Sequence, residues 1–439
     1  MKFRHLALAA ALILSTATGG SAQVPSKGNW LGAWGFVPTP PPPGMSPSPA
    51  LSPAVPLSAV AVQPLPVAAP TPPLLDNPGN VPLVAPESDP ANVTVRQLVR
   101  VAVAGNRIRL RFTNEAGADV LMLGAVHVGM AGPDGSVVPG TDQVVTFDGR
   151  GSVAVPAAAP LLSDPVNMKV TALQKLIITS YVPGKIALGG HSLYQYVAGI
   201  PGDQTAAAQL PSQRIMRLTS LVSQVEVDAT TANAVLVAIG DSITEGAQST
   251  NNAFRSYPDR LAERLVAARS KWSVVNAGIG GNRLLRHGAG HSALARLDRD
   301  VLGVPGVKAV ILLEGINDIG RGFTPLGPQE PVTLEALIAA NKQIIERCRA
   351  HGIKVYGGLL TPYQGAGYAS PAGEAVRTGL NNWIRNSGAF DGVIDFATAT
   401  ADKTNPLTFA PEYNLRDKLH PNDAGYQAMA DAVDLNWFK

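Results

Sequence analysis

The sequence contains only one cysteine, Cys348, among its 439 residues. An internal disulfide is therefore excluded, although proteins without disulfides are also exported. Cys348 lies in an expected helix, one turn after Ile344 and Ile345. A catalytic thiol needs a histidine partner and an exposed position, so this placement favours a packing role.

The sequence also lacks an excess of either charge. It has 35 Lys and Arg against 32 Asp and Glu, and loss of Lys2 and Arg4 with a leader would leave 33 basic residues. Without a basic field to attract phosphates, we expect no nucleic-acid partner. Beyond the N-terminus no segment has the uninterrupted apolar length of a transmembrane helix, so no stable membrane span is expected after signal cleavage.

The N-terminus has the features of a signal peptide. Lys2 and Arg4 precede the apolar run Leu6–Leu14, and small residues lead to Ala22. A membrane anchor or a buried helix is the alternative, but the run is short for a bilayer. We predict a signal peptide over residues 1–22 and a secreted or periplasmic protein.

Residues 38–90 hold 18 of the 37 prolines of the chain. Proline fixes φ and lacks an amide donor, so this stretch cannot form regular helix or central strand. We expect a linker or insertion, with a ligand for a proline-binding module as the alternative.

Residues 91–231 show a period of two. In Arg107–Phe112, Ile108, Leu110 and Phe112 share one face and the arginines share the other. Short strands are expected at Val95–Val103, Val120–Val128, Val144–Phe147, Ser152–Val155 and Leu176–Val182. Strands at this spacing are typical of an antiparallel β-sandwich. The arginine row is interpreted as a solvated face, with a carbohydrate-facing surface as the alternative.

Residues 232–439 alternate between apolar runs and amphipathic helices, which predicts a parallel α/β sheet. Strands are expected at Val235–Ile239, Trp272–Ala277, Val307–Leu313, Val355–Leu360 and Val393–Phe396. Helices are expected at Pro258–Arg269, from Thr333 through His351, and at Asn422–Leu435.

Four short blocks in this part carry residues suited to acyl transfer. Ser242 follows a buried strand and a Gly-Asp turn, where the carboxyl ends of strands bind ligands. A serine hydroxyl needs a base, and His420 is the best candidate. Asp417, three residues earlier, is placed to orient the imidazole.

The other two blocks supply donors for a tetrahedral oxyanion. Gly281 follows the second strand in a glycine-rich turn, where its backbone N–H is open to a ligand. Asn317 follows the third strand and offers an amide donor, although with Asp318 it could instead cap a turn. The backbone N–H of Ser242 is a third donor.

The ordered set Ser242, Gly281, Asn317 and His420 resembles the SGNH hydrolases, or GDSL-type esterases. Ile243 stands where leucine is common in the first block. The resemblance implies a flavodoxin-like, five-stranded parallel sheet, no metal or cofactor, and assistance of His420 by Asp417. A secreted branch of the family carries an N-terminal β-rich region similar to Trp34 and Val95–Glu115, so residues 23–37 are expected to begin that region.

Together these features predict a secreted serine esterase that forms an acyl-enzyme. Its expected substrates are small: short-chain acyl or aryl esters, or an acetylated carbohydrate. The loops Gly320–Val332 and Tyr363–Val376 are expected to rim the site, with Phe323, Tyr363 and Tyr368 available for contact. Two alternatives stay open: a carbohydrate-binding envelope protein with a vestigial hydrolase domain, and an O-acyltransferase. The sequence leaves the acyl group, the alcohol and the oligomeric state open.

Overall fold

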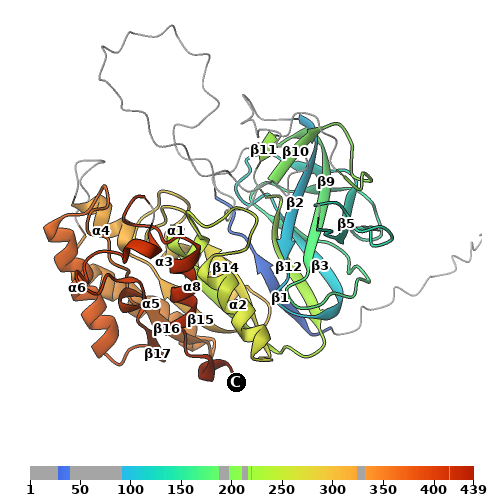
Figure 1. Cartoon of the computed structure of the whole chain (residues 1–439). Helices are drawn as coiled ribbons and strands as arrows, with labels where there is room; N and C mark the ends of the chain where they lie inside the picture. The colour runs from blue at the N-terminus through green and yellow to red at the C-terminus, as the bar shows by residue number, and fades with distance from the viewer. Residues whose placement is uncertain are drawn as a thin grey trace, which may run out of the picture.

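A computed structural model describes residues 28–39, 91–133, 135–186, 197–209, 216–218, 220–323, 332–414 and 416–439. The expected signal peptide and nearly all of the proline-rich stretch lie outside these residues. The chain forms an antiparallel β-rich unit beside an α/β unit (Figure 1).

The β-rich unit contains two main antiparallel sheets. One has the order β1-β12-β3-β8 and the other β11-β10-β2-β9-β5-β6, while β4 and β7 form a separate pair. The strands are β1 Trp30–Gly35, β2 Ala91–Arg100, β3 Gly105–Thr113, β4 Leu121–Leu123, β5 Val126–Met130, β6 Gln143–Val144, β7 Val153–Val155, β8 Pro160–Leu162, β9 Lys175–Lys185, β10 Val197–Pro201, β11 Met216–Leu218 and β12 Val222–Ala229. The expected single strand at Val120–Val128 is wrong, because the chain leaves it at Gly124 and re-enters a different sheet.

In β3 the apolar face is buried as predicted, but the arginine face differs from the prediction. Ile108, Leu110 and Phe112 are fully buried. The three arginines between them are not simply solvated, because each pairs with a carboxylate and keeps only 23–25% of its side chain exposed. The pairs are Arg107–Asp228, Arg109–Glu226 and Arg111–Glu115. The outer face of β3 is thus a row of ion pairs.

The α/β unit is built on five parallel strands in the order β14-β13-β15-β16-β17. This confirms the predicted flavodoxin-like sheet. The strands are β13 Ala234–Gly240, β14 Trp272–Gly278, β15 Val307–Leu313, β16 Lys354–Gly358 and β17 Gly392–Ile394. The helices are α1 Ser242–Glu245, α2 Tyr257–Ala267, α3 Ala293–Leu297, α4 Ile316–Gly322, α5 Leu334–Ala350, α6 Pro371–Asn386, α7 Phe396–Thr400 and α8 Asp423–Asp431, with short π or 3₁₀ turns at Asp298–Leu302, Pro411–Tyr413 and Leu435–Phe438.

The strand order reverses at β13. Right-handed connections from β13 to β14 and from β14 to β15 must leave on opposite faces of the sheet. Accordingly α2 packs with α8, while α5 packs against β16 and α3 (Figure 1). The carboxyl ends of β13 and β15 therefore flank a topological switch point, where open α/β sheets bind ligands.

Several predicted boundaries need correction. The expected loop Tyr363–Val376 is wrong beyond Ser370, because Ser370 caps α6 and Pro371 occupies its first turn. The expected last helix, Asn422–Leu435, ends at Asp431, although Asn422 does cap it as its position suggests. Thr333 caps α5 as predicted, and Cys348 is buried within that helix. Burial raises the pKa of its thiol to about 11, in keeping with a packing role.

Strand β1 joins the two units. It pairs with β12 of the β-rich unit and packs against β14 at the edge of the parallel sheet. The Gly32 N–H donates to the Pro305 carbonyl at 3.0 Å, and the Ser273 hydroxyl donates to the Gly32 carbonyl at 2.7 Å. The β-rich unit is therefore hydrogen-bonded to the edge of the parallel sheet of the α/β unit.

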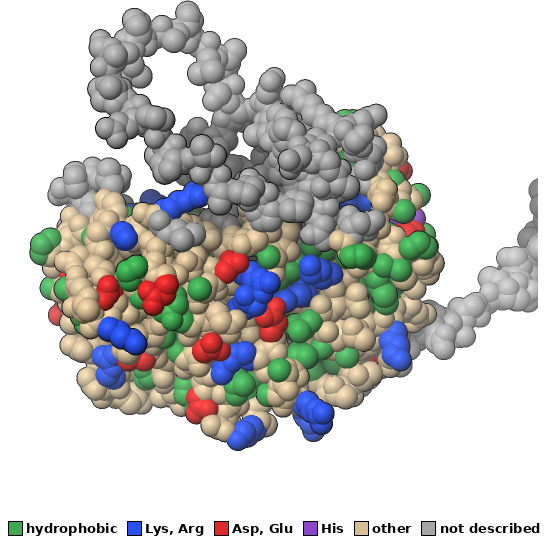
Figure 2. Space-filling view, viewed as in Figure 1, with side chains coloured by type: hydrophobic (Ala, Val, Ile, Leu, Met, Phe, Trp, Pro, Cys, Tyr) green, Lys and Arg blue, Asp and Glu red, His purple; other side chains and the backbone are tan. Residues whose placement is uncertain are grey.

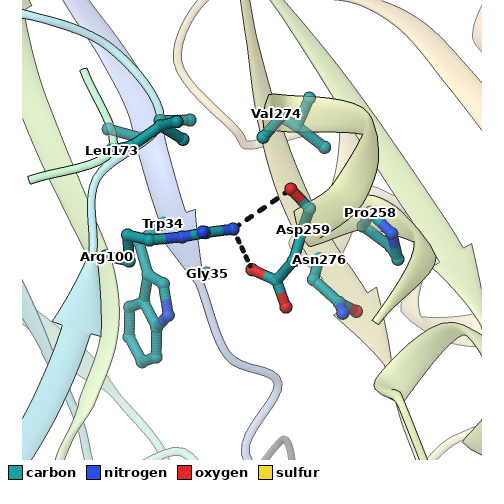
Figure 3. A pocket seen from close by; sticks show the side chains of 11 residues that line it. Trp34, Gly35, Arg100, Leu173, Pro258, Asp259, Val274 and Asn276 are labelled. Carbon is teal, nitrogen blue, oxygen red and sulfur yellow. Dashed lines mark hydrogen bonds and ion pairs between the residues drawn. The ribbon is translucent and has the colours of Figure 1, made fainter. Parts of the chain in front are cut away.

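Arg100, at the end of β2, bridges the units beside this strand. Its guanidinium reaches the carbonyl and carboxylate of Asp259 on α2 at 3.1 and 3.3 Å (Figure 3). It also bonds Glu263 at 2.6 Å and lies 5.0 Å from the centre of the Phe254 ring. Only 8% of the Arg100 side chain is exposed, so water screens this ion pair weakly.

Replacing Arg100 should destabilise the whole chain. Arg100→Met keeps most of the apolar stem but removes the ion-pair partner of Asp259 and leaves Glu263 with Arg260 alone. We expect the free energy of unfolding in urea to fall by about 2–3 kcal/mol. The matched control is Arg385→Met, whose partner Asp395 and own side chain are both more than two-fifths exposed, and which should cost under about 1 kcal/mol. Equal losses in the two variants would contradict a role for Arg100 in joining the units.

Candidate active site

The nucleophile position is created by a tight turn after β13. Asp241 caps α1, and its carboxylate accepts the Ile243 N–H at 2.8 Å, so Ser242 becomes the first residue of the helix. Gly240 is required here, because a Cβ would lie 2.0 Å from the Thr244 hydroxyl and 2.5 Å from the Leu313 carbonyl. Gly246 ends α1 with φ of 108°, a conformation that favours glycine.

The structure brings Ser242, His420 and Asp417 into one hydrogen-bonded line. Ser242 Oγ lies 2.7 Å from His420 Nε2, and His420 Nδ1 lies 2.6 Å from Asp417 Oδ2. All three side chains are partly exposed, so a substrate can reach them. This is the geometry of a serine nucleophile, its general base and an orienting acid.

Asp417 is held as a carboxylate. Burial by itself would raise the pKa of Asp417, but hydrogen bonds from the His420 ring and backbone, together with the Leu419 N–H, lower it well below the usual value. An ionised carboxylate at this place fixes the imidazole with Nδ1 protonated and leaves Nε2 free to accept the serine proton.

Two residues that sequence reasoning missed hold this acid in place. Gln248 Nε2 donates to Asp417 Oδ2 at 2.6 Å. Asn414 Nδ2 donates to Asp417 Oδ1 at 3.4 Å and to the His420 carbonyl at 2.8 Å. Gln248 has φ of 65°, so the loop after α1 bends sharply to direct this side chain. Only Asn414, three residues before Asp417, could have been suspected from spacing.

Three donors expected for an oxyanion follow the carboxyl ends of three adjacent strands, β14, β13 and β15. Gly281 has φ of 74°, and the backbone N–H groups of Ser242 and Gly281 have no acceptor among the described residues. Asn317 Nδ2 donates one hydrogen to the Asn282 carbonyl at 2.9 Å, which leaves its second hydrogen for a ligand. Tyr368 donates its hydroxyl to Asn317 Oδ1 at 3.3 Å and thereby sets which way the amide faces.

A buried arginine ties these strand ends together. Arg296 donates to the carbonyls of Gly240 and Ala277 at 2.9 and 2.7 Å, and to Asn282 Oδ1 at 3.0 Å. Asp318, expected only in the alternative turn-capping role of Asn317, accepts the N–H groups of Leu284 and Leu285. It therefore fixes the loop that follows Gly281.

Two buried carboxyl groups lie behind the nucleophile. Burial raises the pKa of Asp241 to about 7, although the Ile243 N–H and the positive charge available on His420 oppose the rise. Burial and the nearby Asp241 also raise the pKa of Glu314 well above its usual value, against the effect of Arg296. These groups favour the protonated form and lie outside the serine–histidine line.

The loops and aromatic side chains expected around the mouth of the site are only partly where they were predicted. Residues 324–331 of the predicted loop Gly320–Val332 lie outside the described part of the chain. Tyr363 is 1% exposed and cannot offer a contact surface, so that prediction is wrong, and Tyr368 supports Asn317. Among the described residues, no group of three or more His, Cys, Asp or Glu could hold a metal ion, and no helix is long and apolar enough to cross a membrane.

A parallel α/β sheet with a serine, a histidine and an aspartate in one hydrogen-bonded line is the arrangement that a serine-dependent acyl hydrolase requires. Residues 238–428 match the GDSL-like lipase/acylhydrolase family, and this range includes all four blocks. The chain thus carries an SGNH, or GDSL-type, hydrolase domain and is a carboxylic-ester hydrolase. None of the curated proteins compared with it matches the sequence.

Solved structures similar to this chain include three enzymes or enzyme-like proteins. One is described as a lipolytic protein of the G-D-S-L family from Desulfitobacterium hafniense DCB-2, with 25% identity, TM-score 0.35, and coverage of 46% of this chain and 97% of that one. Another is an α/β hydrolase from the metagenome of Lake Arreo, with 23% identity, TM-score 0.37, and coverage of 46% and 94%. A third is an acetylxylan esterase from Geobacillus stearothermophilus, with 20% identity, TM-score 0.36, and coverage of 46% and 93%.

The buried Asp241 should make stability depend on pH. A folded-state pKa of about 7 lies above the ordinary value of 3.8, so the folded protein binds the extra proton and stability falls as pH rises from about 4 to 7. Asp241→Asn keeps an acceptor for the Ile243 N–H but cannot bind the extra proton. The free energy of unfolding of this variant should therefore decrease less steeply with pH, by up to about 1.4 kcal/mol per pH unit. Urea unfolding at several pH values between about 4 and 7 measures this dependence.

The control is Asp298→Asn, which changes a carboxylate with 73% of its side chain exposed. It should keep the wild-type slope. An unchanged slope in Asp241→Asn would show that Asp241 is ionised in the folded protein throughout this range.

Proposed function

We propose that this protein is an exported esterase that transfers the acyl group of a short-chain ester to Ser242 and then to water. The observation that carries the proposal is the Ser242–His420–Asp417 line, with separations of 2.7 and 2.6 Å. Serine becomes nucleophilic only when a base is in hydrogen-bond reach, and this base has its own orienting acid.

The reaction proceeds in two steps. Ser242 Oγ attacks the ester carbonyl while His420 Nε2 accepts its proton, and the N–H groups of Ser242 and Gly281 and the amide of Asn317 stabilise the oxyanion. The tetrahedral intermediate expels the alcohol, which takes the proton from His420. Water, deprotonated by His420, then attacks the acyl-enzyme, and the acid and free Ser242 are released.

A small substrate fits the chain best. The sequence has no long apolar segment that could cover the site and enclose a fatty acyl chain. The described polar side chains of Gln248 and Asn414 lie beside the triad. We infer that short acyl or aryl esters, including acetylated carbohydrate, are the substrate class.

Loss of the nucleophile or base should remove activity. Ser242→Ala and His420→Ala should each lower kcat for p-nitrophenyl acetate by more than about 10³-fold, because the two residues act as one unit. Asp417→Ala should cost less than either. Ser242→Ala with wild-type turnover would contradict the proposal, as would a double variant far worse than the singles. Product analysis with an added glycan acceptor would detect acyl transfer to sugar in place of hydrolysis.

Export rests on the leader alone. In bacterial cells that express the full chain, we expect the protein outside the cytoplasm to begin at Gln23, because small residues at Gly20 and Ala22 mark the cleavage position. N-terminal sequencing measures this. Leu8→Arg interrupts the apolar run and should keep the precursor inside the cell. Exported protein that retains Met1 would indicate a membrane anchor instead.

A further inference from the structure

Arg321 lies on the same helix face as the oxyanion donor Asn317. Both are on α4, Ile316–Gly322, and residues four apart on a helix are neighbours. Nη2 of Arg321 is 3.5 Å from the position that a Cβ would take on Gly281. A guanidinium therefore stands at the edge of the oxyanion site, beside two of its three donors.

This guanidinium forms no ion pair with any acid in the part of the chain that the structure describes. Arg321 is exposed, and among the described residues no carboxylate lies within 4.0 Å of it. Its place is nevertheless defined, because the adjoining Gly320 packs so closely on Tyr368 that a Cβ would meet the ring at 2.1 Å. Guanidinium groups bind carboxylates strongly and with two parallel hydrogen bonds.

A second exposed cation stands next to the catalytic pair in the sequence. Lys418 lies between Asp417 and His420. Asp417 is the only acid in residues 416–420, and His420 already binds it. On the face with α2, by contrast, Figure 2 shows acidic and basic side chains interspersed. Exposed cations beside a binding site attract anions.

We propose that Arg321 is an anion-binding residue of the substrate site and that the natural ester carries a carboxylate near its reacting carbonyl. An acylated sugar acid has this chemistry. The proposal deepens the esterase function and depends on it, since the anion is recognised while Ser242 attacks. The carboxylate is on the alcohol side or on the acyl side of the ester, and substrates of both kinds distinguish the two.

The experiment compares kcat/KM for matched esters. p-Acetoxybenzoate and p-acetoxybenzamide differ only in charge on the alcohol side. Mono-p-nitrophenyl succinate and p-nitrophenyl butyrate differ in charge on the acyl side. We expect the wild type to prefer the anionic member of one pair by about tenfold or more, the value of one charge-assisted hydrogen bond. Added potassium chloride should reduce this preference.

Arg321→Gln should abolish the preference, and Arg321→Lys should keep part of it. The matched control is Arg269→Gln, an exposed arginine just before β14 begins, at the end of the sheet opposite the site. It should keep the wild-type ratio. If Arg321→Gln lowers kcat/KM equally for charged and neutral esters, Arg321 acts on the oxyanion and the anion-binding proposal is wrong.

The two proposals fail in different ways. Turnover that survives in Ser242→Ala would refute the esterase mechanism, whatever Arg321 does. Ser242-dependent turnover without any wild-type preference for a charged ester, in either pair, would refute the anion-binding role alone.

Discussion

The active site depends on one buried cation, Arg296. Its side chain is completely buried and is paired with Asp300 at 3.2 Å, with Glu314 3.8 Å away. A charge at such depth is tolerated only when its donors are satisfied. The N–H groups of Arg296 donate to carbonyls at the carboxyl ends of β13 and β14 and to Oδ1 of Asn282. Because Asn282 in turn receives the amide of Asn317, a single guanidinium aligns all three strand ends that supply oxyanion donors. Lysine, a point charge with three donors, could not replace its planar fork.

The β-rich unit contributes to the same alignment from the outside. β14 is an edge strand, and an uncovered edge is a liability in any sheet. β1 lies against it so closely that a Cβ on Gly35 would be 2.4 Å from the side chain of Val275. β14 leads directly to the turn that contains Gly281. By packing on β14, β1 therefore also stabilises the position of this oxyanion donor. The β-rich unit thus helps to support the catalytic sheet.

Sequence patterns predicted the parts of this protein that depend on local physics. The apolar run Ala309–Leu313 favours a strand buried on both faces, and the structure places β15 at Val307–Leu313 with these five residues buried. The start of α6 was missed because Pro371 and Gly373 are common loop residues, and the cap at Ser370 is a weak signal. Arg296 could not be recognised, because an arginine in a short helix is normally exposed. Its burial follows from strand ends that meet only after folding. The partners of the arginines in β3 were hidden for the same reason, as Glu226 and Asp228 lie more than a hundred residues away.

The triad shows the same division between local and distant contacts. Asp417 Oδ1 accepts the N–H groups of Leu419 and His420, both at 3.0 Å, so acid and base are fixed to each other within one turn. The three-residue spacing of Asp417 and His420 therefore allowed their pairing to be predicted from the sequence. Ser242 lies 178 residues away and must be brought to them. α8, which begins just after His420, is docked on the loop after α1 because Tyr426 donates to the Ala247 carbonyl at 2.6 Å and Asp423 accepts the Thr250 N–H at 2.8 Å. Gln248, in that same loop, completes the connection to Asp417. The packing of α8 on this loop therefore sets the distance between the nucleophile and its base, while Asp417 and His420 are already fixed to each other by local hydrogen bonds.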